Sequence, residues 1–190
     1  PTISRRQRQM CIRDRIGFTY NAGESSMMYG YWTRVFKSGG YNLRNSVDLA
    51  TFPDASPKAD DETVETLEFG MKTDFEKGRL NWAFFNTVVD DSQRMTNIQD
   101  PVSGVAQVVK NAGDIEYRGF EIDGVYTMTD TITMVASLGY VHSKYKNLIS
   151  DLTGDFIIDA LDYALEVPRA APLTYSLGFN IDGNLGTWRS

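Results

Sequence analysis

The sequence contains a single cysteine, Cys11, and a single histidine, His142, among its 190 residues. One cysteine cannot close a disulfide within the chain, and a lone histidine without a second histidine or a cysteine beside it cannot build the usual zinc sites. The sequence also lacks a nucleophile elbow, a Walker loop and a dinucleotide fingerprint. We therefore expect no enzyme activity, no metal site and no cofactor, and we interpret His142 as a residue near the end of a strand.

Long apolar runs are also missing, because no window holds the roughly 18 uninterrupted apolar residues of a membrane helix. This absence does not exclude a membrane protein. Strands of a transmembrane barrel alternate apolar and polar side chains, so their average hydropathy resembles that of a soluble protein.

An arginine-dense block, PTISRRQRQMCIRDR, opens the chain at residues 1–15 with five arginines and one aspartate. The net charge of the whole chain is −6, so the remainder carries about −10, which argues against a nucleic-acid partner. A basic arm or a disordered tail would explain the block, but RRQRQMCIRDR resembles the translation of a transposase-type sequencing adapter. We predict that residues 1–15 are a non-native, loosely attached segment, and that residues 16–190 are an interior piece of a longer gene.

Alternating side chains dominate the rest of the chain, most clearly at Glu62–Gln93, where two runs flank a polar turn at Glu76–Arg79. In the first run the apolar residues fall on one face and the polar residues on the other, which is the period of a β-strand. The apolar members are Leu67, Phe69, Met71 and Phe75, and the polar members are Glu68, Lys72 and Asp74. Both runs exceed the roughly 5–6 residues usual in soluble proteins and reach the about 9–11 that cross a bilayer.

The same alternation predicts about eight strands separated by connections that are short and long in turn. Beside the two runs of Glu62–Gln93, strands are expected at 16–20, 26–36, 114–127, 131–146, 173–182 and from 185 onward. Short connections are expected at 21–24, 76–79, 128–130 and 183–184, and long ones at 37–61, 96–109 and 147–171. This rhythm is typical of outer-membrane barrels, with tight periplasmic turns and long extracellular loops. Within the third long connection, Phe156–Leu165 fits a short helix as well as a strand.

The side chains on the two expected faces fit a barrel wall. Carboxylates cannot lie against lipid cheaply, so those within the strands should point into a wet lumen or lie at its rim. These are Glu68, Asp74, Glu121, Asp123 and Asp182. Aromatic residues suitable for the belts at the membrane interfaces are Tyr29, Tyr31, Trp32, Trp82, Tyr140 and Tyr175.

Four short motifs lie at Phe36–Asn42 (FKSGGYN), Glu62–Lys72, Arg79–Gln93 and Asn111–Glu121. Together they resemble the motifs of one family, the TonB-dependent outer-membrane receptors. The first resembles the family's "GFKSGGFN" segment, and the second resembles its "PETV…E-hydrophobic-G-hydrophobic-K" strand. Arg79–Gln93 is similar to the strand that follows, and Asn111–Glu121 resembles its "NAG…G-hydrophobic-E" strand. The motifs occur in the family's order over nearly all of 16–188. Asp61 stands where the family usually has proline and Val35 where glycine is common, and neither change breaks a strand.

The resemblance implies an all-β fold, an antiparallel transmembrane β-barrel fragment of about eight strands. It would be part of a larger, plugged barrel of the 22-stranded type, and its piece would form an open, curved sheet. The family's plug domain and its C-terminal aromatic residue are not evident, so we expect a chain truncated at both ends. Because lipid does not tolerate open strand edges, we expect residues 16–190 alone not to form a transporting barrel.

The resemblance also implies a function in the bacterial outer membrane: TonB-dependent uptake of a scarce nutrient such as a ferric siderophore. The implied partners are a TonB-type energy-coupling protein, the small-molecule ligand and outer-membrane lipid. Candidate ligand-binding residues at the outer mouth are Arg34, Lys37, Tyr41 and Arg44, since basic residues there would attract an anionic chelate. Solvation of the loop or hydrogen bonding in the lumen would explain each of these residues as well.

Three other classes of protein compete with this interpretation. A soluble β-sandwich that binds ligands, such as a lectin-like domain, should have shorter strands and no alternation of loop lengths. An outer-membrane enzyme would need a Ser/His/acid set, for which His142 has no evident partners. A passive porin obeys the same strand physics, and only the motif set favours the receptor over it.

Overall fold

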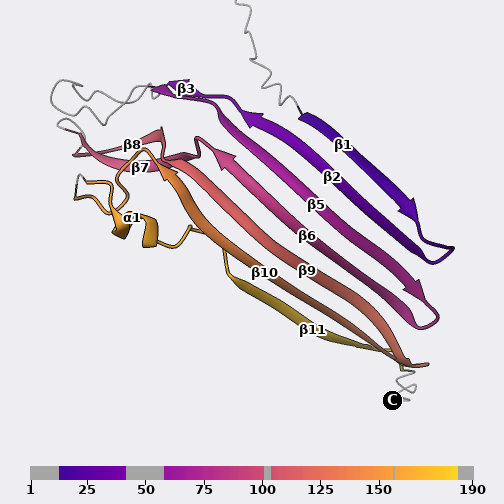
Figure 1. Ribbon diagram of the computed structural model, residues 1–190. Helices are drawn as coiled ribbons and strands as arrows, with labels where there is room; N and C mark the ends of the chain where they lie inside the picture. The colour runs from indigo at the N-terminus through magenta and orange to yellow at the C-terminus, as the bar shows by residue number, and fades with distance from the viewer. Residues whose placement is uncertain (1–12, 42–57, 101–103, 156, 184–190) are drawn as a thin grey trace, which may run out of the picture.

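The computed structural model describes residues 13–41, 58–100, 104–155 and 157–183. Seven long antiparallel strands form one sheet in the order β1-β2-β5-β6-β9-β10-β11 (Figure 1). Their bounds are β1 (Arg13–Asn21), β2 (Ser26–Lys37), β5 (Glu62–Phe75), β6 (Gly78–Asp90), β9 (Gly113–Thr129), β10 (Ile132–Leu148) and β11 (Leu173–Ile181). The sheet is open, because among the described strands β1 and β11 each pair on one side only. The all-β, open-sheet prediction is therefore confirmed, and the eighth strand expected from 185 onward lies outside the described residues.

Tight turns join β1 to β2, β5 to β6 and β9 to β10 at one end of the sheet, and the long connections leave from the other end (Figure 1). We call these the turn end and the loop end. At the loop end lie two small hairpins, β3 (Gly40–Tyr41) with β4 (Lys58–Ala59) and β7 (Gln93–Asp100) with β8 (Gly104–Asn111), and a short helix, α1 (Ala160–Ala164). The expected alternation of connection lengths is present.

The expectation of a long loop without strands at 96–109 is wrong, because most of this stretch forms the β7–β8 hairpin. The two strands pair in register from Gln93 with Asn111 to Asp100 with Gly104. Residues 93–100 read QRMTNIQD and show no period of two. The hairpin thus forms by backbone pairing without an alternating pattern, with the side chain of Val108 buried, and its mostly polar sequence had favoured a loop.

Cross-strand register divides the seven-stranded sheet into two unlike faces. Glu68 lies opposite Tyr31, and Glu121 lies opposite Ala83, which puts these side chains on one face. We define the polar face by Tyr29, Tyr31, Glu68, Lys72, Asn81, Glu121, Asp123, Ser137 and Ser176. We define the apolar face by Phe18, Trp32, Leu67, Phe69, Trp82, Phe84, Phe120, Leu138, Tyr140 and Tyr175.

A row of rings crosses four strands on the apolar face. The centroid distances are 5.7 Å for Phe69–Trp82, 5.4 Å for Trp82–Phe84, 6.1 Å for Phe84–Phe120 and 5.8 Å for Phe120–Tyr140. Such spacing is typical of favourable aromatic pairs. The face remains exposed, with Phe84 at 56%, as expected of a surface that meets lipid.

Two aromatics expected in an interface belt are on the other face. Tyr29 and Tyr31 lie on the polar face, where their hydroxyls donate to the Glu68 carboxylate at 2.8 and 2.5 Å. The segment YGYW has aromatic residues at both parities, so composition could not assign its faces. Of its three aromatics, only Trp32 is on the apolar face.

The first strand begins earlier than expected. Arg13–Arg15 belong to β1 and pair with Thr33–Val35 of β2, and the Arg15 guanidinium lies 3.9 Å from the centroid of the Tyr31 ring. The expectation that the whole of 1–15 is loosely attached is therefore wrong for its last three residues. Residues 1–12 lie outside the described part, and the non-native origin of the block stays a prediction.

The helix alternative for Phe156–Leu165 is confirmed for its second half only, because α1 spans Ala160–Ala164. Its N-cap, Asp159, accepts a hydrogen bond from the Leu161 N–H, and the Asp162 carboxylate reaches back to the Asp159 N–H, which together form a capping box. No helix of the described residues has the length and apolar character needed to cross a membrane.

Candidate functional site at the loop end

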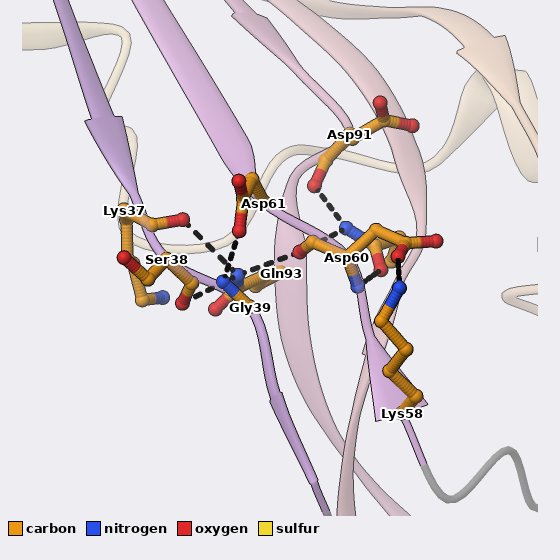
Figure 2. Close-up of polar contacts among 9 residues, drawn as sticks. Lys37, Ser38, Gly39, Lys58, Asp60, Asp61, Asp91 and Gln93 are labelled. Carbon is orange, nitrogen blue, oxygen red and sulfur yellow. Dashed lines mark hydrogen bonds and ion pairs between the residues drawn. The ribbon is translucent and has the colours of Figure 1, made fainter.

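Gln93, directly after the turn that follows β6, ties three segments together (Figure 2). Its Nε2 donates to the carbonyl oxygens of Lys37 at 3.4 Å, Ser38 at 3.3 Å and Asp60 at 2.8 Å. Its backbone N–H donates to Glu62 Oε2 at 2.6 Å. One side-chain amide thus satisfies carbonyls from the end of β2 and from the segment before β5.

Asn111, the last residue of β8, completes this network. Its Oδ1 accepts from the Asp60 N–H at 2.8 Å, and its Nδ2 donates to the carbonyls of Asp60 at 3.1 Å and Asp91 at 2.6 Å. Asp61 Oδ1 accepts from the Gly39 N–H at 2.6 Å (Figure 2). We call Gln93, Asn111, Asp60, Asp61 and Glu62 the clamp, because they hold the starts and ends of the long connections together.

The backbone around the clamp has a positive φ at two positions. Asp91 has a φ of 53°, and its N–H donates to Asp114 Oδ1 at 3.0 Å. Gly113 has a φ of 125°, and a Cβ there would lie 2.0 Å from the Asn147 carbonyl oxygen. Only glycine fits such a position, which explains why the Asn-Ala-Gly run ends in glycine.

The clamp brings together segments of all four motifs. Lys37–Gly39, Glu62, Gln93 and Asn111–Gly113 come from four different motifs and meet at the loop end. In the sequence these residues were noted only as parts of motifs that resemble those of the family, and no structural role was predicted for Gln93 or Asn111. The signal that could have found them is a carboxamide residue directly before or after a strand end, where carbonyls lack ladder partners.

The predicted ligand-binding residues do not all lie at one place. Lys37 ends β2, and Tyr41 of β3 is exposed and lies opposite Lys58 of β4. Arg34 instead lies on the same side of β2 as Trp32, and its Nε is 3.3 Å from Glu65 Oε1. Arg44 lies outside the described residues. The structure therefore brings Lys37 and Tyr41 to the loop end and separates Arg34 from the polar face.

Lys58 forms an ion pair with Asp60, the clamp residue two positions later. This hydrogen bond raises the pKa of the Lys58 ammonium, because it favours the charged form. The β3–β4 hairpin is thus anchored to the clamp through both its backbone and a charged side chain.

Asp162 organises the connection between β10 and β11. Its carboxylate is fully buried and accepts the N–H groups of Leu152 at 2.8 Å, Thr153 at 2.9 Å and Asp159 at 3.0 Å. These bonds, the one from Asp159 first, lower the pKa of Asp162 although burial opposes them. The connection is consequently folded around a carboxylate.

The same connection packs on the polar-face side of β9 and β10. Val167 forms a buried cluster with Ile115, Tyr145 and Leu148. Arg94 of β7 donates to the Tyr145 hydroxyl, and its guanidinium lies 5.7 Å from the centroid of that ring. The β7–β8 hairpin and the 149–171 connection are therefore fixed to the same two strands.

A groove of about 630 Å³ lies between the middle of the sheet and its turn end, lined by residues of β1, β2 and β5. Glu68, held by two tyrosine hydroxyls, lies in its wall, and the Lys72 ammonium lies 5.9 Å from the Tyr29 ring centroid. No three His, Cys, Asp or Glu residues are grouped so as to hold a metal ion in the part of the chain that is described. What this wall offers chemically is fixed charge, hydroxyl groups and aromatic rings.

Two solved structures share this fold. One is the ferric yersiniabactin uptake receptor FyuA from Yersinia pestis, at 17% identity and a TM-score of 0.55, over 70% of this chain and 18% of that one. The other is the copper transporter OprC, at 17% identity and a TM-score of 0.62, over 89% of this chain and 24% of that one. The chain thus spans about a fifth to a quarter of the length of these proteins.

A family model described as TonB dependent receptor-like, beta-barrel matches residues 15–190. The match covers all seven strands of the sheet except the first two residues of β1. Barrels of this family lie in the bacterial outer membrane. Since such barrels have apolar outer faces, short periplasmic turns and longer extracellular loops, we assign the apolar face to the lipid, the polar face to the lumen and the loop end to the outside. The chain belongs to the TonB-dependent receptor-like β-barrel family.

Proposed function

We propose that this chain forms part of the wall and outer mouth of a receptor that takes up a scarce nutrient in a TonB-dependent manner. The observation that carries the proposal is the clamp, in which four motif segments meet beneath the outer connections. A mouth held at fixed geometry can present its connections to a ligand with little loss of conformational entropy.

The ligand class that we propose is an anionic metal chelate such as a ferric siderophore. The two similar structures are a ferric yersiniabactin receptor and a copper transporter, so a metal-containing nutrient is consistent with both. Lys37 and Tyr41 are the proposed contacts, together with Arg44. A cation and a phenol at the entrance suit an anionic chelate through charge and hydrogen bonding. Arg34 fits this role poorly because it lies on the lipid-facing side with Glu65.

The proposed partner is a TonB-type energy-coupling protein in the inner membrane. The test is uptake of radiolabelled ferric chelates by cells that carry the full-length gene, with and without an uncoupler of the proton gradient. Uptake that stops when the gradient collapses supports the receptor. Uptake that continues unchanged would overturn it in favour of the passive porin.

The ligand residues have a test of their own in the same assay. We expect Lys37→Gln combined with Tyr41→Ala to lower uptake by at least tenfold at limiting chelate. The matched control is Arg34→Gln, which removes a cation from the other face of the same strand and should leave uptake within twofold. Equal uptake by both variants would remove Lys37 and Tyr41 from the ligand site while leaving the receptor proposal standing.

A further inference from the structure

The segment that follows α1 covers the lumen side of the sheet at its outer end. Val167 packs in one buried cluster with Ile115, Tyr145 and Leu148. Ile115 has the same parity on β9 as Glu121 of the polar face, and it lies opposite Tyr145 of β10. The cluster therefore lies on the side that we assign to the lumen, and the chain that continues from Val167 runs beside the outer mouth.

Arg169, two residues beyond Val167, has an unusual backbone conformation. Its φ is 64°, in the left-handed region that glycine adopts freely and that other residues reach at a cost, because Cβ crowds a carbonyl oxygen. Packing on either side holds the residue there, since Val167 is buried and Ala170 packs against the same cluster. Glycine or asparagine would adopt this conformation more readily than arginine does.

The side chain of Arg169 is exposed and has no hydrogen-bond or ion-pair partner within the described part of the chain. Asp91, the other described residue besides glycine with a positive φ, differs in this respect. Its N–H donates to Asp114 and its carbonyl oxygen accepts from Asn111, so its conformation serves contacts inside the protein. A disfavoured conformation without such contacts is characteristic of residues that meet a ligand.

Arg169 is also the single cation of an otherwise acidic connection, because residues 149–171 contain five carboxylates and one arginine. The buried Asp162 and three further aspartates accept backbone N–H groups of the turns and of α1. Glu166 forms no ion pair with Arg169 among the described residues. The acidic groups thus mostly stabilise the connection itself, whereas the cation takes no part in holding it together.

A second arginine reaches the same cluster from the β7–β8 hairpin. Arg94 donates to the Tyr145 hydroxyl, and its guanidinium lies 5.7 Å from the centroid of that ring. A guanidinium has several N–H donors, so this bond leaves others for an external acceptor. Two guanidinium groups, one bound to the cluster and one carried by the chain that packs on it, raise the positive potential on the lumen side of the mouth.

We propose that Arg169 contacts the transported ligand and selects anionic metal chelates, with Arg94 as a second cation at the same cluster. The planar fork of a guanidinium binds the paired oxygens of a carboxylate or a catecholate through two parallel hydrogen bonds. This inference rests on the proposed function, in which the nutrient is such a chelate. It adds a residue of the third connection that the sequence did not indicate, because a φ value becomes visible only in the structure.

The test measures uptake of radiolabelled iron by cells that carry the full-length gene, with and without an uncoupler. The probes are two anionic complexes, ferric citrate and a ferric tricatecholate, and the iron complex of deferoxamine, which carries a free ammonium group. We expect Arg169→Gly to raise the half-saturating concentration of the anionic probes roughly tenfold and to leave the deferoxamine complex unaffected, because one charge-assisted contact is lost. The matched control, Lys144→Gln, removes a cation from the lipid-facing side of β10 and should change neither value.

Hydrogen exchange of the purified full-length protein separates a ligand contact from a structural residue. Glycine suits the positive φ at position 169, so amides of residues 163–171 should exchange more slowly in Arg169→Gly, although uptake is weaker. Arg169→Lys should restore part of the uptake, since it keeps the charge.

Three other results would count against the proposals, and they are distinguishable. Slower exchange with unchanged, gradient-dependent uptake of an anionic probe would overturn the role of Arg169 and leave the proposed function standing. Faster exchange together with weaker uptake would show that Arg169 is a structural residue, which also overturns its role as a contact. Uptake of neither anionic probe by the unaltered protein, or uptake that ignores the gradient, would overturn the proposed function itself.

Discussion

The Nε2 of Gln93 donates to the carbonyl oxygen of Asp60 at 2.8 Å, although the two residues are 33 positions apart in the chain. The same nitrogen also lies within hydrogen-bonding distance of the Lys37 and Ser38 carbonyls. Backbone carbonyls at the ends of strands have no N–H partner on a neighbouring strand, and the carboxamide of Gln93 supplies the hydrogen-bond donor instead. Gln93 is consequently one of the side chains that fix the geometry of the outer mouth.

We predict that Gln93→Leu loosens the outer mouth without unfolding the barrel wall. The variant keeps the side chain's approximate size and removes the donor to three carbonyls, at a cost of about 1–3 kcal/mol in local stability. Hydrogen exchange should become faster in residues 37–39 and 58–62 and stay unchanged in β9 and β10. Gln107→Leu, at an exposed position of β8, is the control; a similar change in exchange there would contradict the clamp.

Leu138 and Val135 test the assignment of the two faces. Both are on β10 and similarly exposed, at 40% and 38%, but they lie on opposite faces. Leu138→Lys should lower the free energy of unfolding in a bilayer by about 2 kcal/mol, because the charge meets lipid, while Val135→Lys in the lumen should cost about 0.5 kcal/mol or less. Denaturant titration of the full-length protein in vesicles measures both. Equal costs would contradict the lipid-facing side.

The close approach of Tyr29 to Gly70 predicts a packing defect. A Cβ at Gly70 would lie 2.7 Å from both Tyr29 Cζ and the Trp82 carbonyl oxygen, so Gly70→Ala should destabilise the wall by about 1–3 kcal/mol. Gly178→Ala on β11 is the matched control, since nothing lies within 4 Å of its added Cβ among the described residues. A thermal unfolding midpoint lowered only by the Gly70 substitution would agree with this packing.

Asp162 predicts a pH dependence of the outer connection. Its pKa is lowered in the folded state, so the carboxylate's contribution to stability is present above its unfolded pKa of about 3.9 and is lost as the pH falls through the lower folded pKa. Amide exchange of residues 150–163, corrected for its intrinsic pH dependence, should show the segment opening below about pH 4.

Two variants separate this effect from general acid unfolding. Asp162→Asn should leave the segment open at neutral pH as well, because the amide cannot accept the same set of N–H groups. Asp130→Asn, in a turn at the other end of the sheet, should leave the profile unchanged. A segment that stays closed in Asp162→Asn would show that the buried carboxylate does not organise this connection.

Much of the barrel wall could be predicted from the sequence, because lipid on one side and water on the other impose a period of two on every strand. Leu173–Ile181 shows this pattern clearly, and β11 has these bounds. The alternation of apolar and polar residues is lost where the strands leave the membrane. At Gln93–Asp100 and Gly104–Asn111 the chain leaves the membrane, and a hairpin forms there through backbone pairing without an alternating sequence.

The candidate site was less predictable than the wall. Resemblance identified the motif segments around Lys37 and Asn111, but nothing in their spacing showed that they meet. Arg34 and Lys37 are three residues apart and were grouped as ligand contacts, yet they lie on opposite sides of β2. Residues three apart on a strand lie on opposite faces, but the sequence placed Lys37 in the connection that follows the strand, whereas β2 in the structure continues to Lys37.

The sequence by itself determined the long strands of the wall, the faces of their regularly alternating stretches, and the alternation of short and long connections, because each of these follows from local periodicity and turn chemistry. Only the tertiary structure decided that Gln93 and Asn111 clamp four segments, that Asp162 folds the third connection, and that Arg169 takes a positive φ beside a buried cluster on the lumen side. The reason is physical: hydrogen bonds and ion pairs between distant segments depend on cross-strand register, which pairing across the whole sheet sets.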